Sequence, residues 1–233
     1  MLAPPQIPVL WQDDTALAVL KPSGILVHNS AWSGPREESL RSQLVQALGA
    51  PLHPVHRLDR GASGVVLFAR GPEPARQWQA AWQSPDTVKE YLALVRGHLT
   101  EAVQVDHPIR DRRTGRSDEV ARPARSQVTP VACSPHERCS LVRVRLFTGR
   151  RHQVRRHLKH LSHPLVGDTT WGKGDVNRHF RERYGLHRLA LHAERLVLVH
   201  PVTAQTVEIR APVPAPLAAL FDRLFDTQAS RCD

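Results

Sequence analysis

The sequence predicts an α+β protein with a central, largely antiparallel mixed sheet flanked by helices. Segments typical of strands outnumber those typical of helices. The two kinds are also interspersed without the regular strand–helix alternation of a parallel α/β sheet. The chain has 233 residues, of which 41% are hydrophobic, so it is long and apolar enough to bury a full core.

The first elements are marked by short apolar runs and by turn residues. We expect strands at Val9–Trp11 and Leu17–Lys21, and a tight turn at Pro22-Ser23-Gly24. A helix is expected over Pro35–Leu48, because its apolar residues recur at helical spacing. A proline in its first turn and a glycine after its last residue fit the two ends of a helix.

The middle of the chain shows both kinds of periodicity. Val65–Phe68 is an uninterrupted apolar run between turn residues and predicts a buried strand. Pro74–Gln83 predicts a helix with Trp78 and Trp82 on one face, and Val88–Val95 predicts another strand.

The second half continues with an Arg-rich stretch, Asp106–Gln127, which we expect to be an exposed loop or hairpin and the most mobile segment. Alternation at Leu141–Phe147 predicts a strand that places Arg143 and Arg145 on one face. The remaining expected elements are a helix from Gly149 to His160, strands at Leu189–Val199 and Thr206–Arg210, and an amphipathic helix at Leu217–Phe225.

The charge of the chain points to a polyanionic partner. Lys and Arg number 32 against 22 Asp and Glu, a net charge of +10, and 28 of the 32 are Arg. Arg binds phosphate through two parallel hydrogen bonds and stacks on bases, so this balance favours nucleic acid. An Arg-rich genome would raise the Arg content everywhere, so the argument also requires the charge to be clustered.

Several classes of protein are excluded or disfavoured. No apolar stretch is long enough to cross a bilayer, and the first residues lack the pattern of a secretory signal. Three cysteines without a C-x-x-C pair disfavour a disulfide scaffold and a structural zinc site, and they fit a reducing compartment, the cytoplasm.

The segment from Pro54 to Gly64 combines a carboxylate with cations and glycines. Asp59 lies between Arg57 and Arg60 and precedes two glycines and the predicted buried strand. Glycines allow a tight turn and close approach to a ligand, and flanking cations favour an ionised carboxylate, as a nucleophile requires. An Asp near Gly is more commonly a turn former or a helix cap, and the spacing alone does not decide between these roles.

Cationic residues cluster in the segment from Arg143 to Lys159. It holds seven Lys or Arg and no acidic residue, which is typical of a nucleic-acid-binding surface. A solvated basic helix face is the alternative, although no acidic residue at helical spacing pairs with these side chains.

Six ordered segments, which together cover nearly the whole chain, resemble the motif set of the RluA family of pseudouridine synthases. The segments are Lys21-Pro22-Ser23-Gly24; His56-Arg57-Leu58-Asp59 with Ser63-Gly64; Lys89-Glu90-Tyr91; Thr148-Gly149-Arg150 with His152-Gln153 and Arg155; His163-Pro164 with Gly167-Asp168; and Leu191-His192-Ala193. Two positions depart from the usual pattern: Ala62 replaces a Thr, and Trp171 stands where another aromatic residue or His is common.

The resemblance implies isomerisation of uridine to pseudouridine in RNA by one catalytic domain spanning residues 1–233, without a separate N-terminal RNA-binding domain. It assigns Asp59 as the nucleophile, with attack on ribose or base left open. Tyr91 is assigned to packing against the uracil, and Arg150 to pairing with the carboxylate. Residues implied to bind RNA, including Arg57 for displacing the target base, are Arg57, Arg60, Arg143, Arg145, Arg151, Arg155 and Arg156.

Within this family the resemblance favours members that modify uridine 65 of tRNA, acting as monomers without a metal, a cofactor, a membrane or an obligate protein partner. An enzyme acting on ribosomal RNA and a non-catalytic RNA-binding protein or chaperone are the alternatives. His157, His160 and His163 are spaced three apart, but the surrounding positive charge and Pro164 disfavour a metal site.

Overall fold

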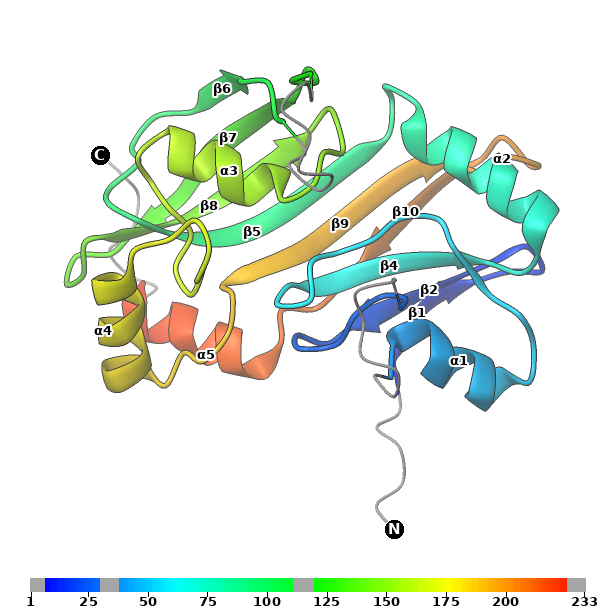
Figure 1. The fold of residues 1–233 in the computed structure, drawn as a ribbon, viewed down its shortest axis with the longest axis horizontal. Coiled ribbons are helices and arrows are strands. Elements are labelled where there is room, and N and C mark those ends of the chain that lie inside the picture. Colours follow the sequence, from blue (N-terminus) through cyan, green and yellow to red (C-terminus); the bar gives the residue numbers. More distant parts are fainter. Residues whose placement is uncertain (1–6, 30–37, 111–119, 226–233) are drawn as a thin grey trace, which may run out of the picture. The chain divides into compact units, whose positions relative to one another are not determined.

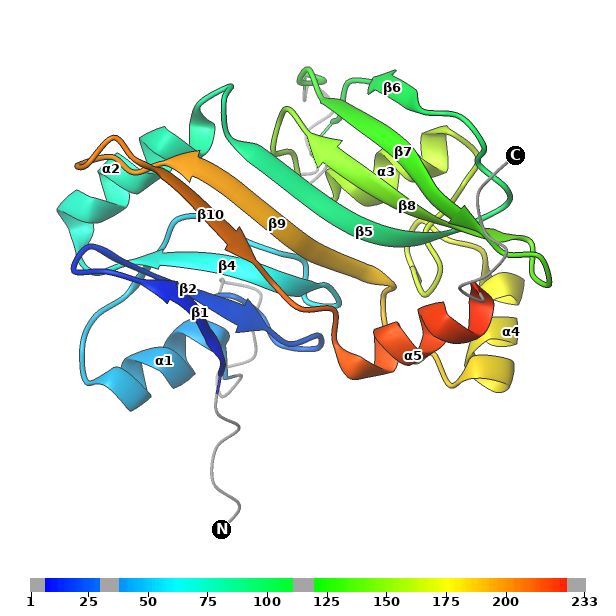
Figure 2. The ribbon, with the colours of Figure 1, turned by 180° about the vertical axis from the view of Figure 1, so that it is seen from behind.

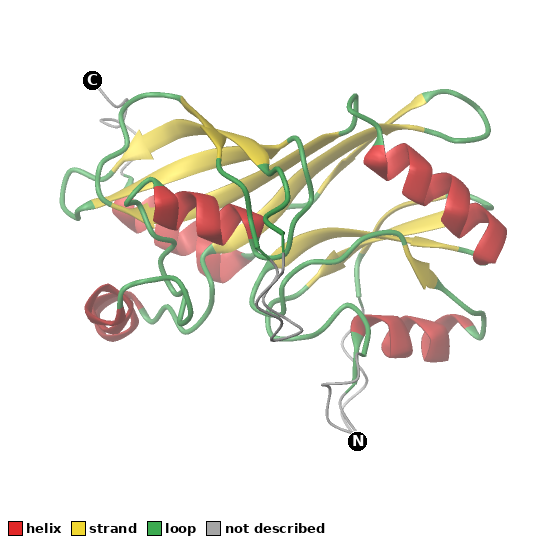
Figure 3. Cartoon of the chain, turned by 45° about the horizontal axis from the view of Figure 1, so that its top comes forward, coloured by secondary structure: helices red, strands yellow, loops and turns green. Residues whose placement is uncertain are grey.

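The computed structural model describes residues 7–29, 38–110 and 120–225, which contain ten strands and five helices (Figure 1). The chain divides into two compact units, which are described separately. Unit 1 comprises residues 1–88 and 193–212, and unit 2 comprises residues 89–192 and 213–233. Strands and helices are interspersed along the chain (Figure 3), and the α+β class is confirmed.

The sheet of unit 1 has antiparallel β1–β2, β2–β4, β3–β4 and β9–β10 pairings. Strand β9 begins in unit 2 with its first two residues and continues in unit 1, where β10 runs alongside it (Figure 2). The strands are β1 (Val9–Gln12), β2 (Ala16–Lys21), β3 (His53–Pro54), β4 (Ser63–Ala69), β9 (Leu191–Val199) and β10 (Thr206–Arg210).

The core of unit 1 forms between this sheet and helix α2 (Pro72–Gln83). All seven residues of β4 are buried, which explains the uninterrupted apolar run in the sequence. Trp78 of α2 is fully buried, and its indole N–H donates to the Thr15 hydroxyl over 3.0 Å. The helix begins two residues before the predicted start, since Pro72 occupies a first-turn position where a missing N–H costs no hydrogen bond.

Helix α1 (Leu40–Leu48) has a defined cap at each end. Ser39 and Ser42 form a capping box at its start, and Gly49 ends it in the left-handed conformation at φ 64°. The predicted C-terminus is therefore confirmed, while the predicted start at Pro35 lies outside the described residues.

The sheet of unit 2 has the order β5-β8-β7-β6, and its neighbouring strands are antiparallel. The two described ends of the Arg-rich stretch pair with each other, as the hairpin alternative predicts: β6 pairs with β7, and a further bridge joins Ile109 to Arg122. Residues 111–119, at its centre, lie outside the described part of the chain. The strands are β5 (Val88–Arg96), β6 (Val103–Asp106), β7 (Arg125–Cys133) and β8 (Cys139–Leu146).

Unit 2 also holds helices α3 (Gln153–His160), α4 (Gly174–Tyr184) and α5 (Ala215–Leu224). The sequence did not predict α4, because that helix is largely polar and buries few of its residues. Helices α4 and α5 share one core cluster with strand residues, formed by Leu94, Leu141, Phe180, Leu217, Leu220 and Leu224 among others. None of the described helices combines the length and apolar character needed to cross a membrane.

We expect Gly64→Ala to destabilise the protein. Gly64 has φ +125°, and a Cβ there would collide with the backbone of Ala193 on β9. Strain and overpacking together should lower the free energy of unfolding by about 2–5 kcal/mol, measured by urea denaturation. Gly174→Ala is the matched control, since a Cβ there meets open space at the start of α4. Equal stability of the two variants would contradict the prediction.

Candidate functional site

Asp59 lies in the loop between β3 and β4 of unit 1, where it is partly buried. The buried ammonium of Lys21 holds this loop from beneath. Its Nζ donates to the Arg60 carbonyl over 3.2 Å and to the carbonyls of Pro22 and Ile25 over 2.7 Å each. All three protons of the ammonium are therefore matched by backbone acceptors, which makes a buried lysine tolerable.

The tight turn after β2 adds further bonds to the Asp59 loop. The Ser23 hydroxyl donates to the Gly61 carbonyl over 2.6 Å. The Gly24 N–H donates to the Arg60 carbonyl over 2.8 Å, and Arg60 Nε returns a bond to the Gly24 carbonyl over 2.9 Å. Gly24 has φ +94°, a conformation that favours glycine. The two sequence motifs of unit 1 thus form one rigid support under Asp59.

Arg57 and Arg60, both exposed, flank the carboxylate in this loop. The Ala62 N–H donates to the Asp59 carbonyl over 3.1 Å, so the backbone closes the turn. Ala62 itself is buried. The departure from the usual Thr therefore leaves this loop closed by main-chain bonds.

Tyr91 lies on β5 of unit 2, opposite Val144 of β8, and is 8% exposed. Lys89, two residues earlier on β5, is also buried, and burial lowers the pKa of its ammonium. On β8, Arg143 is exposed and Arg145 half-buried, with the Arg145 guanidinium 5.4 Å from the centre of the Phe147 ring. The predicted alternation of this strand is confirmed.

Arg150 lies in the turn before α3, and the side chain of Gln153 organises that turn. Gln153 is 2% exposed, and its amide oxygen accepts from the Arg150 N–H and from the Thr148 hydroxyl, each over 2.9 Å. Its amide nitrogen donates to the Arg125 carbonyl over 2.9 Å. Arg150 Nε donates to the Pro123 carbonyl over 3.0 Å. One buried amide therefore joins the turn to the start of β7.

This arrangement corrects the predicted start of the helix at Gly149. Helix α3 begins at Gln153, because His152 takes a left-handed conformation at φ 53° and interrupts the helical path. The Gln153 side chain accepts a hydrogen bond from the Arg150 N–H. If the helix began at Gly149, this N–H would lie in its first turn and have no partner within the helix.

The basic residues that follow Arg150 differ in environment. Arg151 is exposed, and Arg156 is half-buried. Arg155 is an internal ion-pair residue, with Nε and Nη2 each 2.7 Å from an oxygen of Asp168 and a side chain only 10% exposed. This geometry does not fit the RNA contact expected of Arg155, because its guanidinium is turned inward to Asp168. Sequence spacing alone does not reveal that direction.

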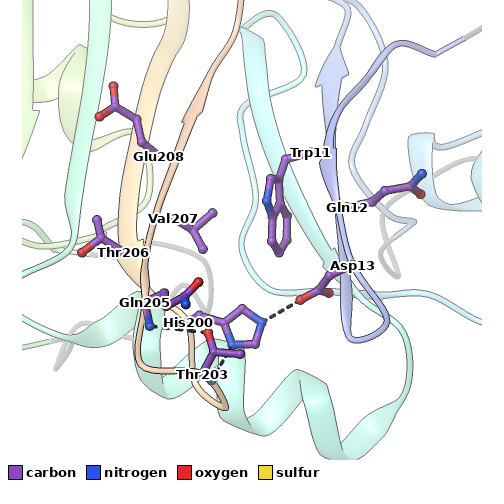
Figure 4. A pocket seen from close by; sticks show the side chains of 9 residues that line it. All are labelled: Trp11, Gln12, Asp13, His200, Thr203, Gln205, Thr206, Val207 and Glu208. Atoms are coloured by element: carbon purple, nitrogen blue, oxygen red, sulfur yellow. Dashed lines mark hydrogen bonds and ion pairs between the residues drawn. The ribbon is translucent and has the colours of Figure 1, made fainter.

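A hollow of about 380 Å³ lies in unit 1 beside β1 and β10 and contains none of the predicted site residues (Figure 4). It contains a His200–Asp13 pair with Nε2 and Oδ2 2.6 Å apart, and both ring nitrogens of His200 already form hydrogen bonds within the protein. His200 Nδ1 accepts the N–H groups of Val202 and Thr203, and burial of Asp13 is outweighed by its hydrogen bonds, which lower its pKa. The pair therefore stabilises the fold.

Comparison with known proteins places these features in a family. A family model described as RNA pseudouridylate synthase matches residues 15–160. The chain is 37% identical over 233 residues to tRNA pseudouridine synthase C of Pasteurella multocida (strain Pm70), covering 94% of this chain and 96% of that protein. It is 38% identical over 218 residues to the protein of the same name from Vibrio cholerae serotype O1, with 87% and 89% covered. The chain belongs to the RNA pseudouridylate synthase family.

Solved structures agree at the level of the fold. Human RNA Pseudouridylate Synthase Domain Containing 1 matches with a TM-score of 0.74 at 24% identity, covering 97% of this chain and 89% of that one. Human RNA Pseudouridylate Synthase Domain Containing 4 gives a TM-score of 0.73 over 93% and 92%. The expected pseudouridine synthase fold is thereby confirmed. The expected isomerase class is confirmed by the family match and by the sequence relatives.

Within this synthase, the predicted site residues fall into two groups. Asp59, Arg57 and Arg60 share one loop of unit 1, whereas Tyr91 and Arg150 belong to unit 2. Their joint action stays a prediction. Sequence reasoning gave no individual role to Lys21 or Gln153, although both lie in quoted motifs; only their burial and hydrogen bonds show what they do. The described residues contain no group of three or more side chains suited to a metal.

Asp168→Asn is expected to lower the free energy of unfolding by about 3–5 kcal/mol at pH 7, because it leaves the Arg155 guanidinium buried without its carboxylate. Burial raises the pKa of Asp168, but bonds from Arg155 and from the N–H groups of Trp171 and Thr170 outweigh it and lower the pKa. The stabilisation is therefore complete above the ordinary pKa of an aspartate and is lost as pH falls through the lower folded value.

The measurement is urea denaturation of wild type and Asp168→Asn at neutral and acidic pH, where the difference between them should shrink. Glu73→Gln is the matched control, because Glu73 pairs with Arg76 over 2.9 Å on the exposed surface of α2. That change should cost less than about 1 kcal/mol. A similar loss in both variants would refute the structural role of the buried pair.

Proposed function

We propose that this protein is a tRNA pseudouridine synthase that converts uridine 65 to pseudouridine, in the cytoplasm and as a monomer. The observation that carries the proposal is the 37–38% identity, over most of both chains, to proteins named tRNA pseudouridine synthase C. The net charge of +10 supports an RNA substrate. We further propose that residues 1–233 act as one catalytic domain.

The proposed reaction is an isomerisation in which Asp59 is the nucleophile. Its carboxylate bonds transiently to the ribose or to the base, and that bond breaks again before the product leaves. The bond from ribose C1′ to uracil N1 breaks, the uracil rotates, and a bond from C1′ to C5 forms. The proton on C5 leaves and N1 gains one, so atoms and electrons balance without an oxidant or reductant. The support under Asp59 from Lys21 and the Ser23-Gly24 turn fits a nucleophile that has to be held in place.

The other proposed roles follow from the family motifs. Tyr91 packs against the uracil, Arg150 pairs with the Asp59 carboxylate, and Arg57 displaces the target base from its stack. Removing a base from its stack costs a few kcal/mol, which phosphate contacts offset. For these contacts we propose the exposed or half-buried Arg60, Arg143, Arg145, Arg151 and Arg156; Arg155 is left out because its guanidinium is paired internally.

Asp59→Asn should abolish turnover and leave folding and RNA binding intact. Tritium release from tRNA labelled at uridine C5 should fall by roughly 10³-fold or more, because the nucleophile is lost. Asp86→Asn, at an exposed aspartate of the same unit, is the matched control and should release tritium at the wild-type rate. Turnover by Asp59→Asn at a comparable rate would remove Asp59 from its role.

The substrate is tested by mapping pseudouridines in tRNA and ribosomal RNA from a strain that lacks the gene. Loss of the modification at tRNA position 65, restored by the wild-type gene and not by Asp59→Asn, is the expected result. Loss at a ribosomal site instead would make the protein a ribosomal RNA enzyme. An unchanged map, with RNA binding retained, would favour the non-catalytic chaperone.

Gln153→Met should reduce kcat by roughly 10-fold or more with a smaller change in KM, because Arg150 loses the amide that fixes its backbone. Gln153→Glu keeps the accepting oxygens and should retain more activity. Because Gln153 acts through Arg150, combining Gln153→Met with Arg150→Gln should be no slower than Arg150→Gln alone. Multiplicative losses in this cycle would assign Gln153 an independent role.

A further inference from the structure

His56 belongs to the same sequence motif as Asp59, yet the roles proposed above leave it without one. It is half-buried and lies three residues before Asp59, just after the chain leaves strand β3. Its imidazole makes one contact in the plane of the ring and another across the face of the ring. Together these two contacts indicate what His56 does.

The first contact replaces a hydrogen bond of the sheet. Strands β3 and β4 are antiparallel, and their register continues so that Val55, the residue after β3, lies opposite Leu67. The Val55 N–H donates to the Leu67 carbonyl over 3.0 Å. In a regular ladder the Leu67 N–H would donate back to the Val55 carbonyl. It donates instead to His56 Nε2 over 3.1 Å.

This exchange lets the backbone turn away from the sheet without leaving a buried polar group unmatched. Leu67 is fully buried, so its N–H needs an acceptor inside the protein. Because the imidazole supplies that acceptor, the chain can bend at residues 55 and 56 and enter the Asp59 loop. Nε2 accepts and therefore carries no proton in this arrangement, since a ring protonated on both nitrogens has no acceptor left.

The second contact fixes the orientation of the ring. His56 stacks on Trp82 of α2, with ring centres 3.8 Å apart and planes inclined by only 3°. Helix α2 is also bonded to the end of β3, because Gln79 Nε2 donates to the Pro54 carbonyl over 3.4 Å. The ring is thus held in its plane by β4 and across its face by α2. These two elements together fix the direction in which the loop leaves the sheet.

We propose that His56 is a positioning residue for the nucleophile, and that it sets where and in which direction the Asp59 loop leaves the sheet. Only Arg57 and Leu58 separate His56 from Asp59, and Leu58 is buried, so a shift at His56 has little chain in which to be absorbed. Lys21 supports the loop on the other side of Asp59. The inference rests on the proposed function, because it takes Asp59 as the nucleophile.

Two substitutions separate the acceptor from the ring. His56→Phe keeps an aromatic ring against Trp82 but removes the acceptor, and it should lower kcat for tritium release by roughly 10-fold or more while KM changes by less than about threefold. His56→Gln should recover much of that loss, because its amide oxygen is as many bonds from Cα as Nε2. Thr15→Val is the matched control in the same unit. It removes the hydroxyl that accepts from the Trp78 indole over 3.0 Å, and it should keep the wild-type kcat.

Trp82→Leu removes the stack and keeps the acceptor, so it should also lower kcat more than it changes KM. It carries the test if urea denaturation shows that His56→Phe does not fold. Independently of activity, ¹⁵N spectra of the wild-type protein should show His56 unprotonated at Nε2.

Several results would overturn the inference: a wild-type kcat in His56→Phe or Trp82→Leu, equal losses in His56→Gln and His56→Phe, the same loss in Thr15→Val, or a proton on Nε2. Failure of the proposed function gives a different result, because turnover would then persist in Asp59→Asn.

Discussion

The candidate active site depends on the hydrogen bonds of the buried Lys21 ammonium. It lies at the end of β2, yet one of its three hydrogen bonds reaches the loop that carries Asp59. A charge in the protein interior is stable only when acceptors surround it, so this side chain forces the turn after β2 and the Asp59 loop into a single arrangement. The Ser23 and Gly24 bonds complete the same arrangement from the exposed side.

Unit 2 uses buried polar side chains in the same way. The amide of Gln153 joins the Arg150 turn to β7, and the Arg155–Asp168 pair joins α3 to the loop that carries Trp171. These internal bonds leave the other cations of α3 at the surface. The positive charge that the sequence shows as one continuous run is therefore divided between an internal ion pair and side chains at the surface.

The spacing of apolar residues predicted most of the fold. Where an element buries one face, apolar residues recur along the sequence with the period of that element. Strand β4 and helix α5 are examples. Prediction failed where apolar pattern is weak: α4 is largely polar, and β6 with the start of β7 is rich in charge. The start of α3 was missed because it depends on the left-handed His152 and on a side-chain amide, neither of which leaves a periodic signal.

Residue order and spacing were enough to establish the α+β class, the family and the set of candidate residues, since they carry motifs and periodicity directly. What each charged or polar side chain does became clear only from the folded chain. Arg155 and Arg156 are adjacent in sequence, yet one pairs with buried Asp168 and the other lies over Trp171. Consecutive positions on a helix point about 100° apart, so their environments are set by the elements packed around the helix and not by the sequence next to them.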